Sequence, residues 1–223
     1  MNKTAYHNQL NSQLFDYLPL TPDVLAQSVY ITFNNNEMIQ QEAVPMTYFY
    51  LLLTGKAKII KDQANGKRAL LHFLHPGDSI GDLTLVGAET EPKTVIALGK
   101  TSCIGIPIQL AKQELMQNPL FVQALAKEIG EKLLLRMDYY MLQQTYPLDL
   151  RLALLLLETA VDDHYQEKMT ETAEFLGVSY RHLTFTLKRF KEQGLVEKQA
   201  YGYHINAKAL QDYVNQKHKG SSA

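Results

Sequence analysis

The spacing of hydrophobic residues changes twice along the chain and divides it into three stretches. From Val29 to Ile106, apolar and polar residues alternate in short runs separated by turn residues, as in half-buried strands. From Leu120 to Gln144, apolar residues recur with the helical period, as in one long helix. After Pro147 the helical pattern returns in shorter segments, which predicts a compact helical region near the C-terminus.

The first stretch predicts a closed antiparallel roll, because many short strands with regular turns are typical of that architecture. Thr54-Gly55 is expected to end a strand, and Asn65-Gly66 to form a hairpin turn. Short helices are expected at Leu10 to Leu18, from Leu20 onward, and near Leu83 to Leu85. The expected strands are Val29 to Phe33, Met38 to Gln40, Tyr48 to Leu53, Lys56 to Lys61, Arg68 to Leu74, Thr94 to Leu98 and Ser102 to Ile106.

The second stretch is expected to pair with a second copy of the chain. A helix of this length beside a roll with its own core keeps apolar surface uncovered, and a two-fold interface would bury that surface. The alternative is that this face packs only on its own roll. The residues expected in the interface are Val122, Leu125, Ile129, Leu133, Met137 and Tyr140.

The third stretch contains the pattern of a helix-turn-helix between Met169 and Gln193. Thr170 is the expected cap of its first helix, and Gly177 suits the left-handed position at which a helix ends. Ser179 is expected to cap the second helix by accepting backbone N–H bonds. The segment from Leu195 to Ile205 has the pattern of a short hairpin, which would complete a winged helix.

The second helix of this motif separates into two faces. Leu183, Leu187 and Phe190 share one side and predict a buried stripe. Arg181 leads the opposite side, where an arginine can bond guanine through two donors in the major groove. Phe185 on that side would touch a thymine methyl group or, alternatively, pack under the wing. The residues expected to contact bases or phosphates are Ser179, Tyr180, Arg181, His182, Thr184, Phe185, Lys188 and Lys198.

These patterns predict an α+β protein with three parts. Residues 1–118 would form a β-roll sensor domain with N-terminal helices, and residues 119–145 a dimerisation helix. Residues 146–223 would form a winged helix-turn-helix domain for DNA binding, with the hinge at Tyr146-Pro147. Two copies related by two-fold symmetry would place their recognition helices about one DNA turn apart.

Composition changes this picture little. The chain has 223 residues, a formal net charge of −1 and 46% hydrophobic residues, as expected for a globular protein. Basic residues nevertheless outnumber acidic ones from Lys168 to Lys219, as phosphate contacts require. The polar N-terminal segment and the lack of an apolar run of bilayer length predict a cytoplasmic protein with no membrane partner.

Candidate metal, redox and catalytic groups are few. The single cysteine, Cys103, excludes an intramolecular disulfide and a four-cysteine iron–sulfur site within one chain. Cys103 is expected to be a small buried side chain, with a redox sensor or an intermolecular disulfide as the alternatives. His72 and His75 are expected to be surface or turn residues, and Asp162-Asp163-His164 a solvated loop, so no metal site is predicted. No nucleophile–base pair, phosphate loop or carboxylate cluster indicates an enzyme.

With strands, long helix and winged helix in this order, the chain resembles the CRP/FNR family of bacterial transcription regulators over about Leu20 to Ile205. The run from Thr170 to His182 and the region Glu91-Pro92-Lys93 look most like its YeiL-type members. The other segments that carry the resemblance are Tyr48 to Gly55, Asn65-Gly66-Lys67 and Pro76 to Asp82. The resemblance implies a cyclic nucleotide-binding-like jelly roll, a homodimer, palindromic double-stranded promoter DNA, RNA polymerase as a partner and, most often, activation.

The resemblance also implies an effector pocket, and here the chain departs from the cAMP-binding members. Those members hold the cyclic phosphate with a Gly-Glu pair followed by Arg-Ser, because the phosphate needs a fixed guanidinium and a hydroxyl. In this chain Gly81-Asp82 and Pro92-Lys93 stand at these positions. Lys93 and Thr94 could still offer a charge and a hydroxyl to an anion. The expected pocket residues are Gly81, Asp82, Lys93 and Thr94; cAMP is disfavoured, the effector is unknown and no cofactor is predicted.

The predicted function is therefore sequence-specific DNA binding by a homodimeric transcription regulator of the CRP/FNR type, acting as an activator. The alternative is a small-molecule sensor whose winged helix binds another protein. Arg181 and Lys188 on one outward face favour DNA, because a winged helix that binds protein does not need this alignment.

Overall fold

A computed structural model of the chain describes residues 1–6, 17–62 and 68–220. The expected turn at Asn65-Gly66 and nearly all of the expected helix at Leu10 to Leu18 lie outside the described residues. The chain divides into two compact units, residues 1–61 with 71–136 and residues 62–70 with 137–223. We call them the roll unit and the winged unit.

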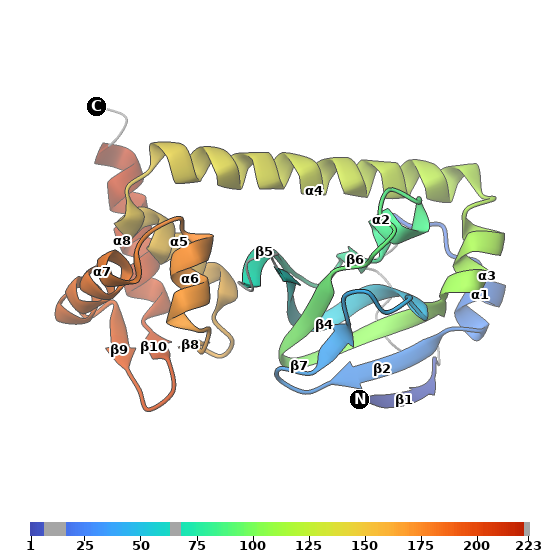
Figure 1. Cartoon of the computed structure of the whole chain (residues 1–223), viewed down its shortest axis with the longest axis horizontal. Helices are drawn as coiled ribbons and strands as arrows, with labels where there is room; N and C mark the ends of the chain where they lie inside the picture. The colour runs from blue at the N-terminus through green and yellow to red at the C-terminus, as the bar shows by residue number, and fades with distance from the viewer. Residues whose placement is uncertain (7–16, 63–67, 221–223) are drawn as a thin grey trace. The chain divides into compact units, whose positions relative to one another are not determined.

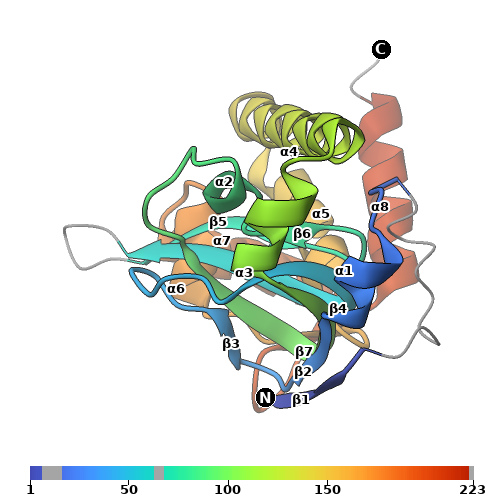
Figure 2. The ribbon, with the colours of Figure 1, turned by 90° about the vertical axis from the view of Figure 1, so that its right-hand side faces the viewer.

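Antiparallel strands build the roll unit, in the order β1-β2-β7-β4-β5, with β3 paired to β7 and β6 paired to β4. Figure 1 labels all of these strands except β3, which Figure 2 labels; Figure 2 also shows β2, β7 and β4 side by side in the sheet. The strands are β1 (Asn2–Ala5), β2 (Val29–Phe33), β3 (Met38–Gln40), β4 (Tyr48–Asp62), β5 (Arg68–Leu74), β6 (Ser79–Ile80) and β7 (Thr94–Pro107). The predicted antiparallel roll is confirmed, and β1, which the sequence pattern did not indicate, extends its edge along β2.

The two longest strands differ from their predicted lengths. β4 runs through Thr54-Gly55, where a strand end was expected, and its register with β7 shifts on both sides of Thr54. Gly55 adopts φ +80°, and a Cβ atom there would lie 2.5 Å from the Lys100 carbonyl oxygen. The glycine therefore makes a bulge inside a continuous strand instead of a turn.

Both faces of β4 are buried, and its alternating residues belong to two cores. Phe49, Leu51 and Leu53 pack in an outer core that includes Phe121 and Leu125 of a helix. Tyr50 and Leu52 point the other way, into an inner core shared with Ile31 and Cys103. This alternation follows from the two-residue period of a strand.

Cys103 lies in the inner core with no exposed surface, as expected for a small buried side chain. Burial raises the pKa of its thiol to about 12, because the thiolate would lose its hydration there. A thiol held in this state is a poor redox sensor.

Helices flank the sheet of the roll unit. They are α1 (Pro22–Ala26), α2 (Asp82–Leu85), α3 (Ile108–Leu110) with a following π-helical turn (Ala111–Leu115), and the start of α4 (Pro119–Thr145). The helix expected from Leu20 onward is α1; Thr21 caps it by accepting a hydrogen bond from the Val24 N–H, and Pro22 occupies its first turn.

The winged unit contains α5 (Leu148–Thr159), β8 (His164–Tyr165), α6 (Met169–Phe175), α7 (Tyr180–Glu192), β9 (Val196–Lys198), β10 (Tyr203–Ile205) and α8 (Ala207–Gly220). Its three strands pair in the order β8-β10-β9. Pro147 stands between α4 and α5, at the predicted hinge, because its ring cannot continue α4. Among the described residues, no helix combines the length and apolar character needed to cross a bilayer.

Candidate nucleic-acid interface and ligand pocket

Helices α6 and α7 form the predicted helix-turn-helix. Gly177 adopts φ +65° just after α6, and the Val178 N–H donates to the Ala173 carbonyl oxygen at 2.9 Å. The Ser179 hydroxyl caps α7 by accepting a hydrogen bond from the His182 N–H at 3.2 Å. These contacts fix a tight turn between two helices, so the predicted left-handed position of Gly177 and the predicted capping of α7 by Ser179 are confirmed.

The cap predicted for α6 is wrong. The helix begins at Met169, with Lys168 in the N-cap position, and Thr170 is an exposed residue of the first turn. The Thr172 hydroxyl instead donates to the Lys168 carbonyl oxygen at 2.9 Å and bonds the Tyr165 hydroxyl. Tertiary contact with β8 thus determines the start of this helix.

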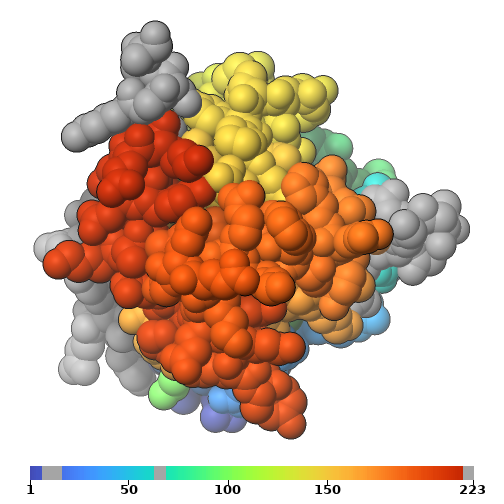
Figure 3. Space-filling view, turned by 90° about the vertical axis from the view of Figure 1, so that its left-hand side faces the viewer, coloured from blue at the N-terminus to red at the C-terminus, as the bar shows by residue number. Residues whose placement is uncertain are grey.

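The two faces of α7 are those that the sequence predicted. Leu183, Leu187 and Phe190 are buried, which fixes the opposite face outward. Phe185 is 60% exposed, so it lies on the outer face and does not pack under the wing. In Figure 3 the orange and red surface belongs to the winged unit, which includes α7. The other predicted contact residues exposed on α7 or at its start are Ser179, Tyr180, Arg181, His182 and Lys188.

Thr184 is half-buried at the edge of this face, and its hydroxyl donates to the Arg181 carbonyl oxygen at 3.0 Å. The hydroxyl can still accept a hydrogen bond, but its proton is used within the helix. Thr184 is therefore a weaker donor to a phosphate than the sequence suggested.

Strands β9 and β10 form the wing beside α7. Lys198 is exposed at the end of β9, and Gly202 returns the chain with φ +82°. A Cβ atom on Gly202 would lie 2.0 Å from the Tyr165 carbonyl oxygen, so only glycine allows β10 to approach β8. Tyr201 at the wing tip is 84% exposed. Sequence reasoning missed this residue, although an aromatic residue in a turn between two short strands is a usable signal.

The buried side of α7 is held by an acidic group on α5. One Asp149 oxygen lies 2.6 Å from the Tyr213 hydroxyl, 3.4 Å from Arg189 of α7 and 3.4 Å from Lys217 of α8. Burial alone would raise the pKa of Asp149, but the Tyr213 hydrogen bond and the Lys217 charge outweigh it and lower that pKa. Asp149 is thus an ionised anchor that joins α5, α7 and α8.

The second candidate site is a pocket of the roll unit, beside the loop that contains α2. Gly81, Asp82 and Lys93, three of the four residues expected in an effector pocket, line it. Thr94 does not: it is buried, and its hydroxyl accepts a hydrogen bond from the Glu42 N–H at 3.0 Å. The prediction for Thr94 is wrong because the alternation of β7 turns successive side chains to opposite sides.

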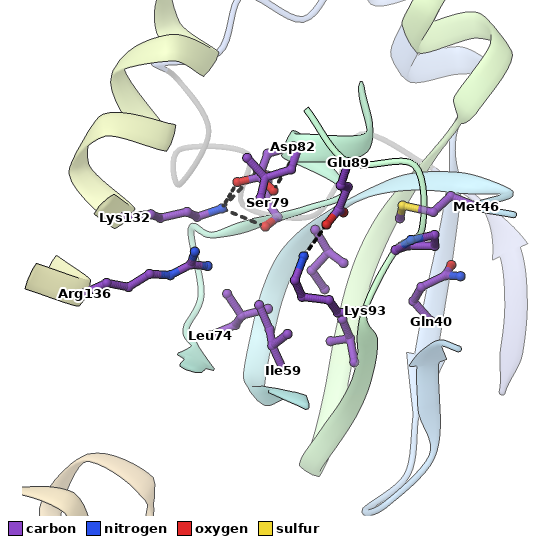
Figure 4. Close-up of a pocket in the computed structure, with 15 residues that line it drawn as sticks. Gln40, Met46, Ile59, Leu74, Ser79, Asp82, Glu89, Lys93, Lys132 and Arg136 are labelled. Carbon is purple, nitrogen blue, oxygen red and sulfur yellow. Dashed lines mark hydrogen bonds and ion pairs between the residues drawn. The ribbon is translucent and has the colours of Figure 1, made fainter. Parts of the chain in front are cut away.

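Helix α4 contributes two cations to this pocket that sequence reasoning did not place there (Figure 4). Lys132 lies 2.7 Å from Glu128, 2.9 Å from Asp82 and 2.8 Å from the Ser79 carbonyl oxygen. Burial would lower the pKa of Lys132, but Asp82 and Glu128 raise it, so the ammonium stays charged. Arg136, one turn further on, also lines the pocket. The four-residue spacing from Glu128 to Lys132 to Arg136 could have indicated one shared face.

A buried histidine lies close to the same cations. His72 of β5 is buried, which contradicts its expected place at the surface or in a turn. Burial, followed by the positive charges of Arg136 and Lys132, lowers its pKa to about 4. His72 is therefore a neutral core residue at physiological pH.

The apolar residues of α4 divide between the roll core and the surface. Leu125 has no exposed surface and belongs to the outer core of the roll, so its predicted place in an interface between copies is wrong. Ile129 packs against the same core, and Val122 is half-buried. Leu133, Met137 and Tyr140 are exposed, together with Leu134 and Met141, which sequence reasoning did not include.

Comparisons with known proteins agree with this architecture. The cyclic nucleotide-binding domain family matches residues 30–118. Regulatory protein YeiL from Escherichia coli O157:H7 is 33% identical over 189 residues, which cover 84% of this chain and 86% of that protein. The probable transcriptional regulator flp from Lacticaseibacillus casei is 29% identical over 190 residues, covering 76% of this chain and 81% of that protein.

Solved structures show the same fold. A putative transcriptional regulator of the crp/fnr family from Eubacterium rectale superposes with a TM-score of 0.70 at 18% identity, covering 93% of this chain and 96% of that one. A CRP-family regulator from Thermus thermophilus gives 0.65 at 18% identity, covering 83% and 96%. These relatives are regulators and not enzymes. Because the YeiL protein is one-third identical across most of both sequences, the chain belongs to the CRP/FNR family of transcription regulators.

Proposed function

We propose that this regulator binds a palindromic DNA site as a homodimer and reads base edges with the exposed face of α7. The observation that carries the proposal is the division of α7 into a buried and an exposed face. Leu183, Leu187 and Phe190 are buried, and Arg181 and Lys188 project from the exposed face. A recognition helix placed in the major groove requires this division.

Within this proposal, the contacts divide by chemistry. Arg181, at the start of α7, reads guanine through two hydrogen bonds, and Phe185 touches a thymine methyl group. Ser179, Lys188 and Lys198 contact phosphates and set the register on the duplex. Tyr180 and His182 lie at the helix start, within reach of bases or phosphates.

The proposed dimer forms through the exposed apolar surface of α4. Leu133, Met137 and Tyr140 are large apolar side chains that one copy of the chain leaves in water. Pairing with a second copy would bury this surface and place two recognition helices on one side of the duplex. We extend the proposal to a cytoplasmic activator that contacts RNA polymerase and takes an effector beside Gly81, Asp82 and Lys93.

A second candidate function is binding of another protein by the winged helix. The exposed aromatic residues favour it: Phe185 and Tyr180 on α7 and Tyr201 at the wing tip. Aromatic residues are enriched in protein interfaces. The outward Arg181 and Lys188 favour DNA over this alternative, because cations on a shared face suit phosphate contacts.

Selection from a random duplex pool tests the proposal. The purified chain should enrich a palindrome whose half-sites are about one helical turn apart, roughly 10–10.5 base pairs. Failure to enrich any sequence, with retained binding to a protein partner, would overturn DNA recognition in favour of the alternative. Enrichment of a single, non-repeated half-site would overturn the two-fold arrangement alone.

A further inference from the structure

The pocket of the roll unit has an apolar floor and a charged rim. Its floor is formed by Met46, Ile59, Leu74, Ile80 and Val95, and its rim carries Asp82, Glu89, Lys93, Lys132 and Arg136. Figure 4 shows the side chains of Lys132 and Arg136 extending from α4 toward the loop that carries Asp82 and Glu89. The enclosed cavity is about 40 Å³, close to the volume of one or two water molecules.

Two of the three cations in this pocket are neutralised by acids of the same unit. Lys132 is bound by Asp82 and Glu128, and both carboxylates are themselves largely buried. Lys93 pairs with Glu89, four residues earlier on the loop. Among the described residues, no acidic side chain pairs with Arg136, so its guanidinium is the cation available at the rim.

Glu89 places a carboxylate against Lys93 at the rim of the pocket. Its carboxylate pairs with Lys93 and also accepts a hydrogen bond from the Thr84 hydroxyl at 2.9 Å. Glu89 belongs to the loop between α2 and β7, where a side-chain rotation can carry the carboxylate toward water. Lys93 would then face the pocket without its partner.

We propose that the pocket binds a small organic monoanion, a carboxylate on a short apolar chain, which displaces Glu89 and pairs with Lys93 and Arg136. This inference rests on the proposed function, since it names the effector class for the pocket of that regulator. The chain of the ligand packs on the Met46, Ile59 and Val95 floor, in the cavity and the space that Glu89 leaves.

The cations of the pocket favour a ligand with one negative charge. With Glu89 turned away, Lys132 still pairs with Asp82 and Glu128. Lys93, which is half-buried, then has no paired acid among the described residues, and a charge in a partly buried site is costly without a counter-charge. A ligand with one carboxylate replaces the single charge of Glu89 and can also meet the exposed guanidinium of Arg136.

Binding also has a route to the rest of the molecule. Arg136 lies on α4 between Leu133 and Met137, two residues of the exposed apolar surface. A ligand held by Arg136 and Lys93 therefore links this part of α4 to the β7 end of the loop. An effector of this kind acts only if it binds one arrangement of α4 better than the other.

Butyrate is the probe, with 1-butanol as its neutral analogue and acetate as the head group alone. Binding is followed by NMR chemical-shift titration of the full chain at millimolar ligand. The Glu89→Gln variant should bind butyrate about tenfold more tightly than the natural chain, because the competing carboxylate is gone. Glu91→Gln, which removes an exposed charge from the same loop, is the matched control and should leave butyrate affinity unchanged.

The cations are tested in the Glu89→Gln background. Adding Arg136→Gln or Lys93→Gln should weaken butyrate binding about tenfold, with little effect on 1-butanol. Equal binding of butyrate and 1-butanol, equal gains in Glu89→Gln and Glu91→Gln, or unchanged affinity after Arg136→Gln would overturn the proposal. If Glu89→Gln does not fold, Glu89→Ser makes the same comparison.

Duplex binding is measured separately on the same variants. Butyrate binding that follows these expectations without duplex selection would overturn the proposed function and leave the pocket assignment standing. Duplex selection without any butyrate response would overturn the pocket assignment alone.

Discussion

Lys132 lies 2.7 Å from Glu128, one turn earlier on α4, and both side chains are buried. Lys127 and Glu131 repeat the same spacing on the same helix at 3.6 Å, but both are exposed. The two pairs have the same sequence signature, so burial alone separates them. The buried pair also reaches Asp82 and Ser79, which ties α4 to the loop of the pocket.

Removing the buried cation should therefore destabilise the roll unit far more than removing the exposed one. Lys132→Met leaves the largely buried carboxylates of Asp82 and Glu128 without their paired cation, and we expect a loss of about 3–5 kcal/mol in the free energy of unfolding. Lys127→Met should cost about 0.5 kcal/mol or less, because water screens that pair. Urea unfolding followed by circular dichroism compares the two variants. Similar losses would show that Lys132 is as well solvated as Lys127.

The anchor of the recognition helix gives a second prediction. Asp149→Asn removes the charge that Arg189 and Lys217 share and weakens the acceptor of Tyr213. We expect the winged unit to lose about 1.5–3 kcal/mol of stability, the range for hydrogen bonds to charged groups. Affinity for the selected duplex should fall evenly across sequences, because the helix loosens without losing a base contact.

Asp212→Asn is the control for this change, because it removes an exposed acid from α8 in the same unit. Thermal unfolding and fluorescence anisotropy on matched and mismatched duplexes measure the two effects. A change in sequence preference, instead of a uniform loss, would contradict the anchoring role of Asp149.

The buried histidine gives the roll unit a dependence on pH. His72 has a pKa of about 4 in the folded chain, against an ordinary value of 6.5. Between these values the unfolded chain binds the proton and the folded chain does not. Stability is therefore complete above about pH 6.5 and falls as the pH drops toward 4, by up to about 3 kcal/mol from this group.

His72→Gln should reduce the dependence of the unfolding free energy on pH between about 4 and 6.5. His75→Gln, at a half-exposed position in the turn, should leave most of this dependence unchanged. Urea unfolding at a series of pH values measures the difference between variants, which removes the shared contribution of the carboxylates. Equal slopes in both variants would mean that folding does not lower the pKa of His72.

Patterns with a fixed local period were predictable from sequence. The faces of α7 follow from helical spacing, and Gly177 marks the end of α6 because only a few residues tolerate positive φ. The strand alternation that separates Phe49 from Tyr50 follows from the same kind of rule. Such features depend on the residue and its near neighbours.

Features that depend on distant contacts were not predictable. The helical pattern places Leu125 on an apolar face of α4. The helix has two apolar surfaces, however, and only its packing on the roll shows which of them is buried. Thr94 was placed in the pocket by position in the sequence, whereas its hydroxyl is held by the Glu42 N–H, far away along the chain. Lys132 and Arg136 reach the pocket from α4, and no local sequence motif predicts this contact.

The proposed base reader is tested by two substitutions at one position. Arg181→Ala should cost about 1–3 kcal/mol in binding to the selected duplex and relax the preference at one base pair. Arg181→Lys keeps the charge but loses the planar pair of donors, so it should relax the same preference with a smaller loss of affinity. Fluorescence anisotropy on duplexes that differ at single positions measures both.

A phosphate contact should behave differently. Lys188→Ala should lower affinity for all duplexes and reduce the salt slope by about one unit. Lys112→Ala removes an exposed cation from the roll unit and should change neither. If Lys188→Ala leaves the slope of log affinity against log salt unaltered, Lys188 is not a phosphate contact.

The last prediction separates the two apolar surfaces of α4. Leu133 is 58% exposed and Leu125 has no exposed surface, although both fit one helical stripe in the sequence. Leu133→Glu should therefore weaken pairing between copies while the roll stays folded, because the new charge would be buried only in the dimer. Leu125→Ala should instead destabilise the roll by about 2–5 kcal/mol, through the cavity it leaves in the outer core.

Sedimentation equilibrium measures dimerisation and urea unfolding measures stability. Both measurements on both variants test which apolar surface of α4 forms the dimer interface. We expect dissociation with normal unfolding for Leu133→Glu, and reduced stability with normal pairing of the folded chains for Leu125→Ala. Dimers that persist in Leu133→Glu at low protein concentration would place the interface elsewhere. The spacing of the half-sites in the proposed DNA site would then follow from that other interface, because the symmetry of the dimer sets the arrangement of its two recognition helices.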